Sequence, residues 1–430
     1  MKALELFLIF LTILSPFFYG SVEKIPLFVI EVVALFIFLF LLFLTKKYNQ
    51  KLIYPAKINL FIIFLSITFL QIIYFPVFFL KIISPNTYLL KQQYGGYFTN
   101  FSQLSFYSIV TLEELVKFVS FFLIFICVLN IFTTKKQFER MLLILIFIGL
   151  SLALYGVVKK YFVLQRQSSY SFSTFGNKNH FAAYMIMISN VSVAYALYCK
   201  NKYKKIIFSF IAAIICASVF LSLSRGGSIS LIIALIMMSC LLAKEKVQTN
   251  QHWIIMGVII FALVLVSISG FGPLSNRMSF VWNSLMDRWT IVADAFTIFK
   301  NFPIFGVGLG NFSDIFTLYQ RSKFVAYYDY LHNDYLQFLF EAGLISAVLL
   351  LVFFFSLFKA ILNETSNRHD PFVKNIVIGG FCGIAGTVIH SFIDFNFHIP
   401  AVTFLFWLLL GLIYKCAYTH FHSGNPADEK

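Results

Sequence analysis

Long apolar runs place the first constraint on this chain. Many stretches of about 18 or more apolar residues follow one another, and a run of that length matches the hydrocarbon core of a bilayer. Of the 430 residues, 60% are hydrophobic and only 12% are charged, which is more apolar surface than a soluble core needs. Helices satisfy their own backbone hydrogen bonds in lipid, so the sequence predicts an all-α polytopic membrane protein.

Hydropathy predicts about twelve transmembrane helices. They cover residues 4–20, 25–45, 58–80, 112–133, 141–158, 180–199, 206–223, 227–243, 253–270, 335–358, 374–391 and 400–418. The first run also fits a signal peptide, because a lysine precedes it, but no small-x-small cleavage site follows. This favours a first helix that is retained.

Basic residues gather on alternate connections between the predicted spans. These connections are 45–51, 134–140, 200–205, 244–246 and 359–374. All of them fall on one side of the membrane, and the positive-inside rule makes that side and both termini cytoplasmic. The formal charge of +15 therefore indicates cytoplasmic loops rather than nucleic-acid binding.

The remaining connections lie on the outer face and hold most of the polar motifs. The longest, 271–334, far exceeds the roughly 15 residues beyond which a loop is usually functional. Within it, residues 281–300 have helical apolar spacing, which predicts an amphipathic helix at the outer interface. The sequence thus predicts one membrane domain, 1–430, with a partly helical periplasmic cap at 271–334 and an active site on the outer face.

Arg225, in "SLSRGGS", is the strongest candidate for binding an anion. Two glycines allow close backbone approach, the following helix offers free N–H groups at its start, and arginine carries a forked permanent charge. The alternative is an arginine that reaches towards lipid headgroups. A second cation facing Arg225 would complete a clamp for a diphosphate, and Arg288 on the predicted cap helix is the candidate, with Arg277 as its competitor.

His332, in "LHNDYL", is the candidate general base. An imidazole with an ordinary pKa of about 6.5 can take a proton near neutral pH, and a neighbouring carboxylate could orient it. Asn333 and Asp334 follow directly. Asp334 would not face His332 on a regular helix and is also suited to cap the next span. The alternative is an interfacial histidine beside a capping aspartate.

Two further outer segments are rich in polar residues. In "STFGNKNHFAAY", Lys178 is suited to the same anion as Arg225, and His180 lies near it. Asn179 is suited to cap the next span, and a loop with a cap is the favoured interpretation of both Asn177 and Asn179. In "HSFIDFNFHIPA", the polar residues Asp394 and His398 alternate with aromatic ones. Metal binding is conceivable there, but the spacing favours hydrogen bonds that shape an outer cavity.

Three other features carry weaker signals. Glu341 lies inside a predicted span, where a carboxylate is a functional candidate by default, although it is near the outer end. The glycines of "GVGLGNF" (306–312) lack the strand-then-helix context of a dinucleotide site and indicate a turn after Pro303. Six cysteines in or beside apolar runs predict neither a disulfide framework nor a metal cluster.

The polar motifs together resemble a known family. "FGNKNHFAAY", "SRGG", "FPIFGVGLGNF", "LHNDYLQFLFEAGLI" and "HSFIDFNFHIPA" stand in the order seen in the O-antigen ligase and polymerase superfamily. The resemblance covers roughly residues 170–410, whereas the first 130 residues match only as apolar helices.

The resemblance implies an inverting glycosyltransferase with a C-type glycosyltransferase-like fold in the bacterial inner membrane. Its donor would be a glycan on undecaprenyl diphosphate, and its acceptor the lipid A core or a growing polysaccharide. The ligase pattern assigns catalysis to His332 and binding of the diphosphate to Arg225, with a looser match for Arg288. Lys178 would assist that binding, and the supporting residues would be Asp334, Asn333, His180, Asp394 and His398.

No cofactor is implied, and the outer loops contain no Asp-x-Asp motif, which predicts a metal-independent reaction. The motifs do not separate a ligase from a polymerase or from an enzyme that glycosylates proteins. A secondary transporter is the alternative from another class, because twelve spans are common among transporters. However, the chain shows neither two related halves nor charges at the midplane of the membrane.

Overall fold

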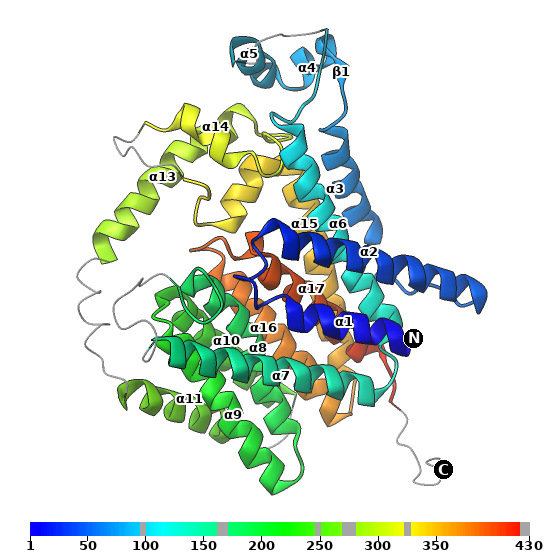
Figure 1. Cartoon of the computed structure of the whole chain (residues 1–430), viewed down its shortest axis with the longest axis vertical. Coiled ribbons are helices and arrows are strands. Elements are labelled where there is room, and N and C mark those ends of the chain that lie inside the picture. The colour runs from blue at the N-terminus through cyan, green and yellow to red at the C-terminus, as the bar shows by residue number, and fades with distance from the viewer. Residues whose placement is uncertain (95–99, 161–170, 246–250, 269–280, 322–327, 422–430) are drawn as a thin grey trace.

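The computed structural model describes residues 1–94, 100–160, 171–245, 251–268, 281–321 and 328–421. Within these ranges, the side chains of residues 251–252, 263, 265–268 and 281–288 are not described. The described chain is mostly helical (Figure 1). A short antiparallel pair of strands, β1 (Phe75–Pro76) and β2 (Phe101–Ser102), is its sheet structure.

The helices follow one another in this order: α1 (Lys2–Leu14), α2 (Lys24–Lys47), α3 (Ile58–Leu70), α4 (Val77–Ile83), α5 (Pro85–Tyr94), α6 (Ser108–Ile131), α7 (Lys135–Val158), α8 (Lys178–Tyr198), α9 (Lys202–Leu221), α10 (Arg225–Lys244), α11 (Gln251–Ile268), α13 (Val281–Asn301), α14 (Phe312–Tyr319), α15 (Asp334–Ser366), α16 (Pro371–His390), the 3₁₀-helix η2 (Asn396–His398) and α17 (Pro400–Tyr418).

The all-α membrane class predicted from the sequence is confirmed. Each predicted span contains a helix, and among the described residues nine helices are long and apolar enough to cross a membrane. Three predicted C-terminal ends were wrong, and one of them is that of α15, which continues to Ser366 and not to residue 358. The helix predicted to reach residue 20 ends at Leu14, because Pro16 cannot donate the bond that would continue it. The helix predicted to reach residue 80 ends at Leu70, and the chain then enters β1.

Helix α8 lies at the centre of the bundle and packs against α16 and α9. Small residues bring α8 and α16 together. A Cβ added to Gly379 would lie 2.3 Å from the Cβ of Ala194, and one added to Gly383 would lie 2.9 Å from the Cα of Met187. Two glycines four residues apart at such a contact are typical of helices that associate by close backbone packing in membranes.

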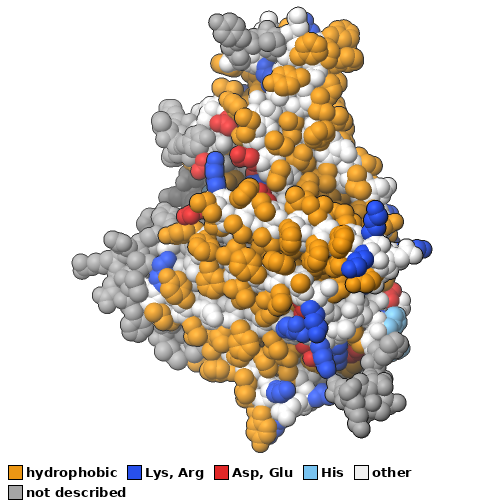
Figure 2. All heavy atoms as spheres, turned by 45° about the vertical axis from the view of Figure 1, so that its right-hand side comes forward, with side chains coloured by type: hydrophobic (Ala, Val, Ile, Leu, Met, Phe, Trp, Pro, Cys, Tyr) orange, Lys and Arg blue, Asp and Glu red, His pale blue; other side chains and the backbone are white. Residues whose placement is uncertain are grey.

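The five basic connections gather at one end of the bundle. Lys374 forms an ion pair with Glu245, Arg140 one with Glu5, and the side chain of Asn130 binds the backbone of Ile53. These contacts join the starts and ends of helices that are far apart in sequence. A broad band of hydrophobic side chains covers the face of the molecule shown in Figure 2, as lipid-facing surface would.

The predicted outer connections meet at the opposite end of the bundle. The hydroxyl of Thr174 donates to the carbonyl of Pro16 at 2.6 Å, and the backbone N–H of Asp334 donates to Ser391 at 3.1 Å. The amide of Gln71 donates to the carbonyl of Phe305 at 2.8 Å. The separation of basic and polar connections that was predicted from the sequence therefore appears in the fold.

Helix α15 is broken at Gly343, which has φ 74° and ψ 174°. A break leaves backbone N–H and C=O groups without helical partners, and each unpaired group would cost free energy in lipid. The loop 303–308 supplies the partners. Leu344 N–H donates to the carbonyl of Pro303 at 2.8 Å, and the carbonyl of Glu341 accepts from the N–H of Gly308 at 2.9 Å.

The turn predicted after Pro303 is therefore bound along the backbone of α15. Beyond it, α13 and α14 pack on the first half of α15 around a second apolar cluster that includes Ile298, Phe316 and Phe340. The helix predicted at 281–300 is confirmed as α13. The cap thus has its own small core, and its loop 303–308 attaches it to α15.

We expect Gly343→Ala to destabilise the protein by at least about 2 kcal/mol, because its positive φ disfavours a Cβ. In addition, the new Cβ would lie 2.3 Å from the carbonyl oxygen of Ile304. Gly257→Ala is the matched control, since a Cβ there would meet nothing within 4 Å. Thermal unfolding of both variants in detergent measures the difference, and equal midpoints would contradict the close approach at Gly343.

Candidate functional site

His332 lies at the end of the cap, just before α15, in a conformation that few side chains adopt. Its φ of 56° lies in the left-handed region, which costs energy for a residue other than glycine. The ring lies 4.9 Å from that of Phe395, which itself stacks on Tyr330 at 4.4 Å. The His332 side chain remains 31% exposed. The surrounding structure thus holds this imidazole in place and leaves one part of it open.

Asp394 is the carboxylate that faces His332. Its Oδ1 lies 3.4 Å from Nδ1 of His332 and 3.9 Å from Nε2 of His180, and it accepts from the backbone N–H of Phe395 at 2.9 Å. Only 1% of its side chain is exposed. Burial raises the pKa of Asp394, but the hydrogen bond with His332 and the charges of His180 and His332 outweigh burial and hold the pKa well below its usual range.

An ionised Asp394 determines where the proton of His332 resides. A carboxylate beside Nδ1 favours a proton on Nδ1, which leaves Nε2 with a lone pair that can accept a proton. Burial raises the pKa of the neighbouring Tyr330 to about 12, so this phenol stays neutral beside the pair. The arrangement is that of a general base oriented by a buried acid.

The predicted anion motif is linked to the same carboxylate. The side-chain amide of Asn179 donates to Oδ2 of Asp394, and its oxygen accepts from the hydroxyl of Ser224 at 2.8 Å. Ser224 in turn caps α10 by accepting from the N–H of Gly227 at 3.2 Å. Arg225 is therefore the first residue of a capped helix, and its side chain is exposed.

The glycines of "SRGG" permit this packing. A Cβ at Gly226 would lie 2.2 Å from Cδ1 of Ile393, and one at Gly227 would lie 2.4 Å from the Cβ of Ala182. The start of α10 thus fits tightly against the segment that carries Asp394. Four motifs that are far apart in sequence, around residues 179, 224, 332 and 394, meet at one place.

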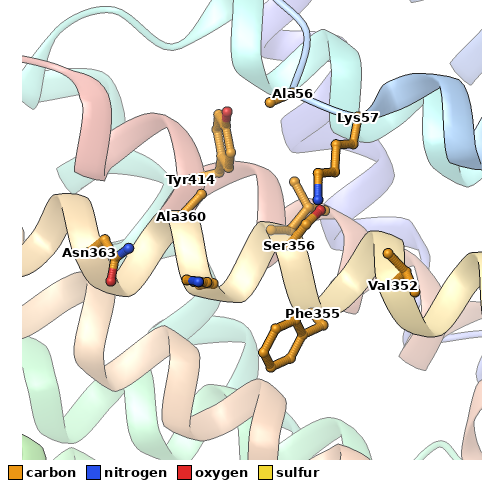
Figure 3. A pocket seen from close by; sticks show the side chains of 10 residues that line it. Ala56, Lys57, Val352, Phe355, Ser356, Ala360, Asn363 and Tyr414 are labelled. Atoms are coloured by element: carbon orange, nitrogen blue, oxygen red, sulfur yellow. The ribbon is translucent and has the colours of Figure 1, made fainter.

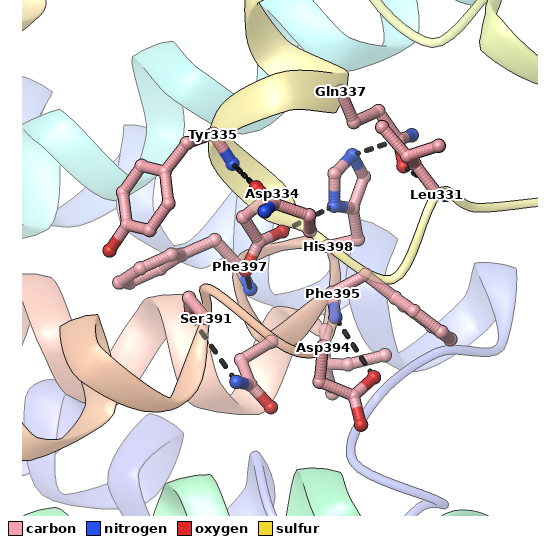
Figure 4. A network of polar contacts seen from close by, with 12 residues as sticks. Leu331, Asp334, Tyr335, Gln337, Ser391, Asp394, Phe395, Phe397 and His398 are labelled. Atoms are coloured by element: carbon pink, nitrogen blue, oxygen red, sulfur yellow. Dashed lines mark hydrogen bonds and ion pairs between the residues drawn. The ribbon is translucent and has the colours of Figure 1, made fainter. Parts of the chain in front are cut away.

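A second polar network lies beside the first and joins α15 to η2 (Figure 4). Oδ1 of Asp334 lies 2.8 Å from Nδ1 of His398, and its Oδ2 accepts from the N–H of Phe397 at 3.0 Å. Gln337 lies 3.2 Å from the other ring nitrogen of His398 and donates to Glu341 at 3.1 Å. Burial lowers the pKa of His398, but the hydrogen bond and charge of Asp334 outweigh it, and the pKa is raised.

The buried carboxylate of Glu341 extends this network to the glycine-rich loop. It accepts from the N–H of Gly310 at 2.8 Å and from that of Phe312 at 3.3 Å. Glu341 is 3% exposed. The hydrogen bonds to these N–H groups explain how a carboxyl group can be tolerated inside an apolar helix. Its role in the structure is to hold the loop 306–312 against α15.

The predicted helix caps are confirmed only in part. Asn333, and not Asp334, caps α15 by accepting from the N–H groups of Tyr335 and Leu336, because Asp334 is the first helical residue and turns towards His398. Of the two asparagines interpreted as a loop with a cap, Asn177 caps α8 as predicted, whereas the side chain of Asn179 points into the network around Asp394. The hydrogen bonds predicted for Asp394 and His398 are present.

The remaining predicted site residues are placed as follows. Lys178 is half-buried in the first turn of α8, next to Asn179, and His180 is buried against Phe395 at 4.7 Å between ring centres. Arg288 lies in α13, but its side chain is outside the described residues, as is all of Arg277. Among the described residues, no group of three or more His, Cys, Asp or Glu side chains could hold a metal ion.

Sequence reasoning missed Ser224 and Gln337, which connect the motifs. Ser224 has the signal of a helix cap, since it precedes two small residues and an apolar run. Gln337 has a signal in its spacing, because it stands four residues after Asn333 and four before Glu341 and so shares one helix face with both.

The fold and the site define a multi-pass membrane protein with a polar site at one end of its bundle. Residues 210–351 match the family model described as O-Antigen ligase. The match supports the O-antigen ligase superfamily that the motifs indicated, and with it a membrane enzyme of the ligase or polymerase type. It spans "SRGG", the cap and the first half of α15. A comparison with curated proteins finds no match.

We expect Asp334→Ala to lower the free energy of unfolding by about 2–4 kcal/mol, because it leaves the partly buried His398 and the N–H of Phe397 without their acceptor. Asp329→Ala is the control, since Asp329 is exposed in the same segment and its loss is expected to change stability by less than about 0.5 kcal/mol. Unfolding of both variants in detergent provides the measurement. An Asp334→Ala variant as stable as the control would refute a bracing role for the network.

Proposed function

We propose that this protein is a membrane glycosyltransferase that moves or polymerises a glycan from undecaprenyl diphosphate onto an acceptor hydroxyl, as an O-antigen ligase does. The observation that carries the proposal is the link from His332 through Asp394, Asn179 and Ser224 to the start of α10. A proton acceptor and an anion-binding helix start are thereby held together. Transfer from a diphosphate donor needs both of these functions.

His332 would act on the acceptor. Its Nε2 would take the proton of the attacking hydroxyl as the new bond to the anomeric carbon forms. The charge of Asp394 would stabilise the imidazolium that results, without itself taking the proton. The exposed part of the His332 side chain gives an acceptor access to the ring.

Arg225 would act on the leaving group. As the bond from the sugar to the diphosphate breaks, negative charge develops on the departing oxygen, and a fixed cation stabilises that charge. Arg225 is the first residue of α10, so its guanidinium would act together with the N–H groups at the start of that helix. Lys178 is the first residue of α8, next to Asn179, and would add a second positive charge. We propose Arg288 as a further diphosphate ligand from α13.

The surroundings of Asp394 favour a single displacement with inversion. A retaining enzyme would need a carboxylate that can attack the sugar. Both oxygens of Asp394 already accept hydrogen bonds, and the side chain is almost fully buried. It is therefore suited to orient His332 and not to form a covalent intermediate.

The basic connections at the opposite end of the bundle support an inner-membrane protein with both termini in the cytoplasm and the site facing the periplasm. A reporter fused to the C-terminus that is active only in the cytoplasm tests this orientation. Its activity would agree with the proposed topology, whereas periplasmic activity would reverse it.

His332→Ala should slow transfer by about 10²–10⁴-fold, the range that general bases contribute. The assay is release of undecaprenyl diphosphate by the purified protein from a lipid-linked glycan donor with an acceptor present. His369→Ala is the matched control, because His369 is exposed at the basic end of the bundle. Full activity of a well-folded His332→Ala variant would remove His332 from its proposed role.

Asp394→Asn should keep the shape of the site but reduce turnover by at least about 100-fold, because an amide can favour the wrong tautomer of His332. The expected loss is in kcat rather than in KM for the donor. A loss confined to KM would show that Asp394 shapes donor binding and does not orient the base.

The proposed reaction needs no metal, since Arg225 and Lys178 provide the positive charge. Transfer by purified enzyme should therefore be unchanged in excess chelator. Loss of activity that returns on addition of a divalent cation would contradict this part of the proposal.

Deletion of the gene in its native host would distinguish the acceptors. Long glycan chains left unattached to lipid A would indicate a ligase, and single repeat units attached to it would indicate a polymerase. Loss of another surface polysaccharide with normal lipopolysaccharide would indicate a third acceptor class.

A further inference from the structure

A cavity of about 320 Å³ lies between the start of α3 and the second half of α15 (Figure 3). Its position is at the end of the bundle that carries the basic connections, away from His332. Lys57, the residue before α3, lies above Ser356 of α15, and Lys359 lies one turn further along α15. The volume is within the range of roughly 300–1,000 Å³ that is typical of small-molecule sites.

The cavity presents positive charge without compensation. Neither Lys57 nor Lys359 forms an ion pair with a described residue, and the residues that line the cavity include no Asp or Glu. Asn363 adds a side-chain amide that can donate a hydrogen bond to an anion, whereas the hydroxyl of Ser356 donates to the carbonyl of Phe353 at 2.7 Å. The backbone of Lys57 has φ 62°, a conformation that costs energy for lysine and that aims this residue at α15.

The same cavity has an apolar side. Phe355 is 67% exposed and Val352 is 41% exposed, and both line it on the face of α15 that would meet the acyl chains of lipids. A free phosphate would use the lysines but leave these side chains uncovered. A phospholipid with an anionic headgroup would use both parts at once.

We propose that this cavity binds an anionic phospholipid of the leaflet at the basic end, with its phosphate between Lys57 and Lys359 and an acyl chain along Phe355 and Val352. Basic pockets between transmembrane helices on the cytoplasmic side recognise such headgroups. The bound lipid joins α3 to α15. The other end of α3 is followed by Gln71, which holds Phe305 of the cap loop, and the other end of α15 follows His332.

The test is titration of fluorescent phosphatidylglycerol into the full-length protein in neutral detergent, with phosphatidylcholine as the zwitterionic comparison. We expect Lys57→Gln/Lys359→Gln to weaken binding of phosphatidylglycerol about 30-fold, since each lysine near a membrane surface contributes about fivefold. Lys202→Gln/Lys204→Gln is the matched control, because both lysines are exposed at the same end of the bundle. It should bind within about twofold of the unaltered protein.

Two further arms separate the lipid from free phosphate. Phe355→Ser should weaken binding of phosphatidylglycerol about tenfold without changing charge, because it removes apolar contact with the acyl chain. A large excess of inorganic phosphate should displace little of the lipid. Equal affinity in the double variant and its control would overturn the proposal. Complete displacement by phosphate together with no effect of Phe355→Ser would also overturn it, in favour of a plain phosphate site.

Discussion

The site depends on one buried carboxylate. An ionised group cannot remain in an apolar bundle without partners. Asp394 obtains them from His332, from Asn179 and from the backbone N–H of Phe395, and Asn179 in turn accepts from Ser224. These bonds locate His332 at the end of the cap and Asn179 at the start of α8 relative to each other, and through Asn179 they also locate Ser224 at the start of α10. The energetic need to satisfy one charge therefore brings together the proposed base and the helix start proposed to bind the diphosphate.

The network around Asp334 and His398 has a structural role. Asp334, Gln337 and Glu341 lie along one face of α15 and bind His398 on one side and the loop around Gly310 on the other. None of these contacts needs a substrate. They make the first half of α15 a rigid support, so that His332, directly before it, keeps its unusual backbone conformation.

The sequence predicted the helical membrane class, the separation of basic from polar connections and most residues of the site, because hydropathy and charge are local signals. It did not predict which histidine meets which aspartate. His332 is two residues from Asp334 but pairs with Asp394, and Asp334 pairs with His398. Which histidine pairs with which aspartate depends on how the connecting segments are placed in the fold, and this cannot be read from spacing along the sequence. The shortened first and third helices were missed because apolar runs continue past a proline or into a strand without a change in hydropathy.

The break at Gly343 has a consequence for how this protein can diverge. The loop 303–308 and α15 are joined there chiefly through main-chain groups, at distances that leave no room for a side chain at Gly306 or Gly343. Backbone contacts do not change when neighbouring side chains are exchanged. Side chains that line the cap can therefore be exchanged while His332 keeps its position relative to the membrane helices.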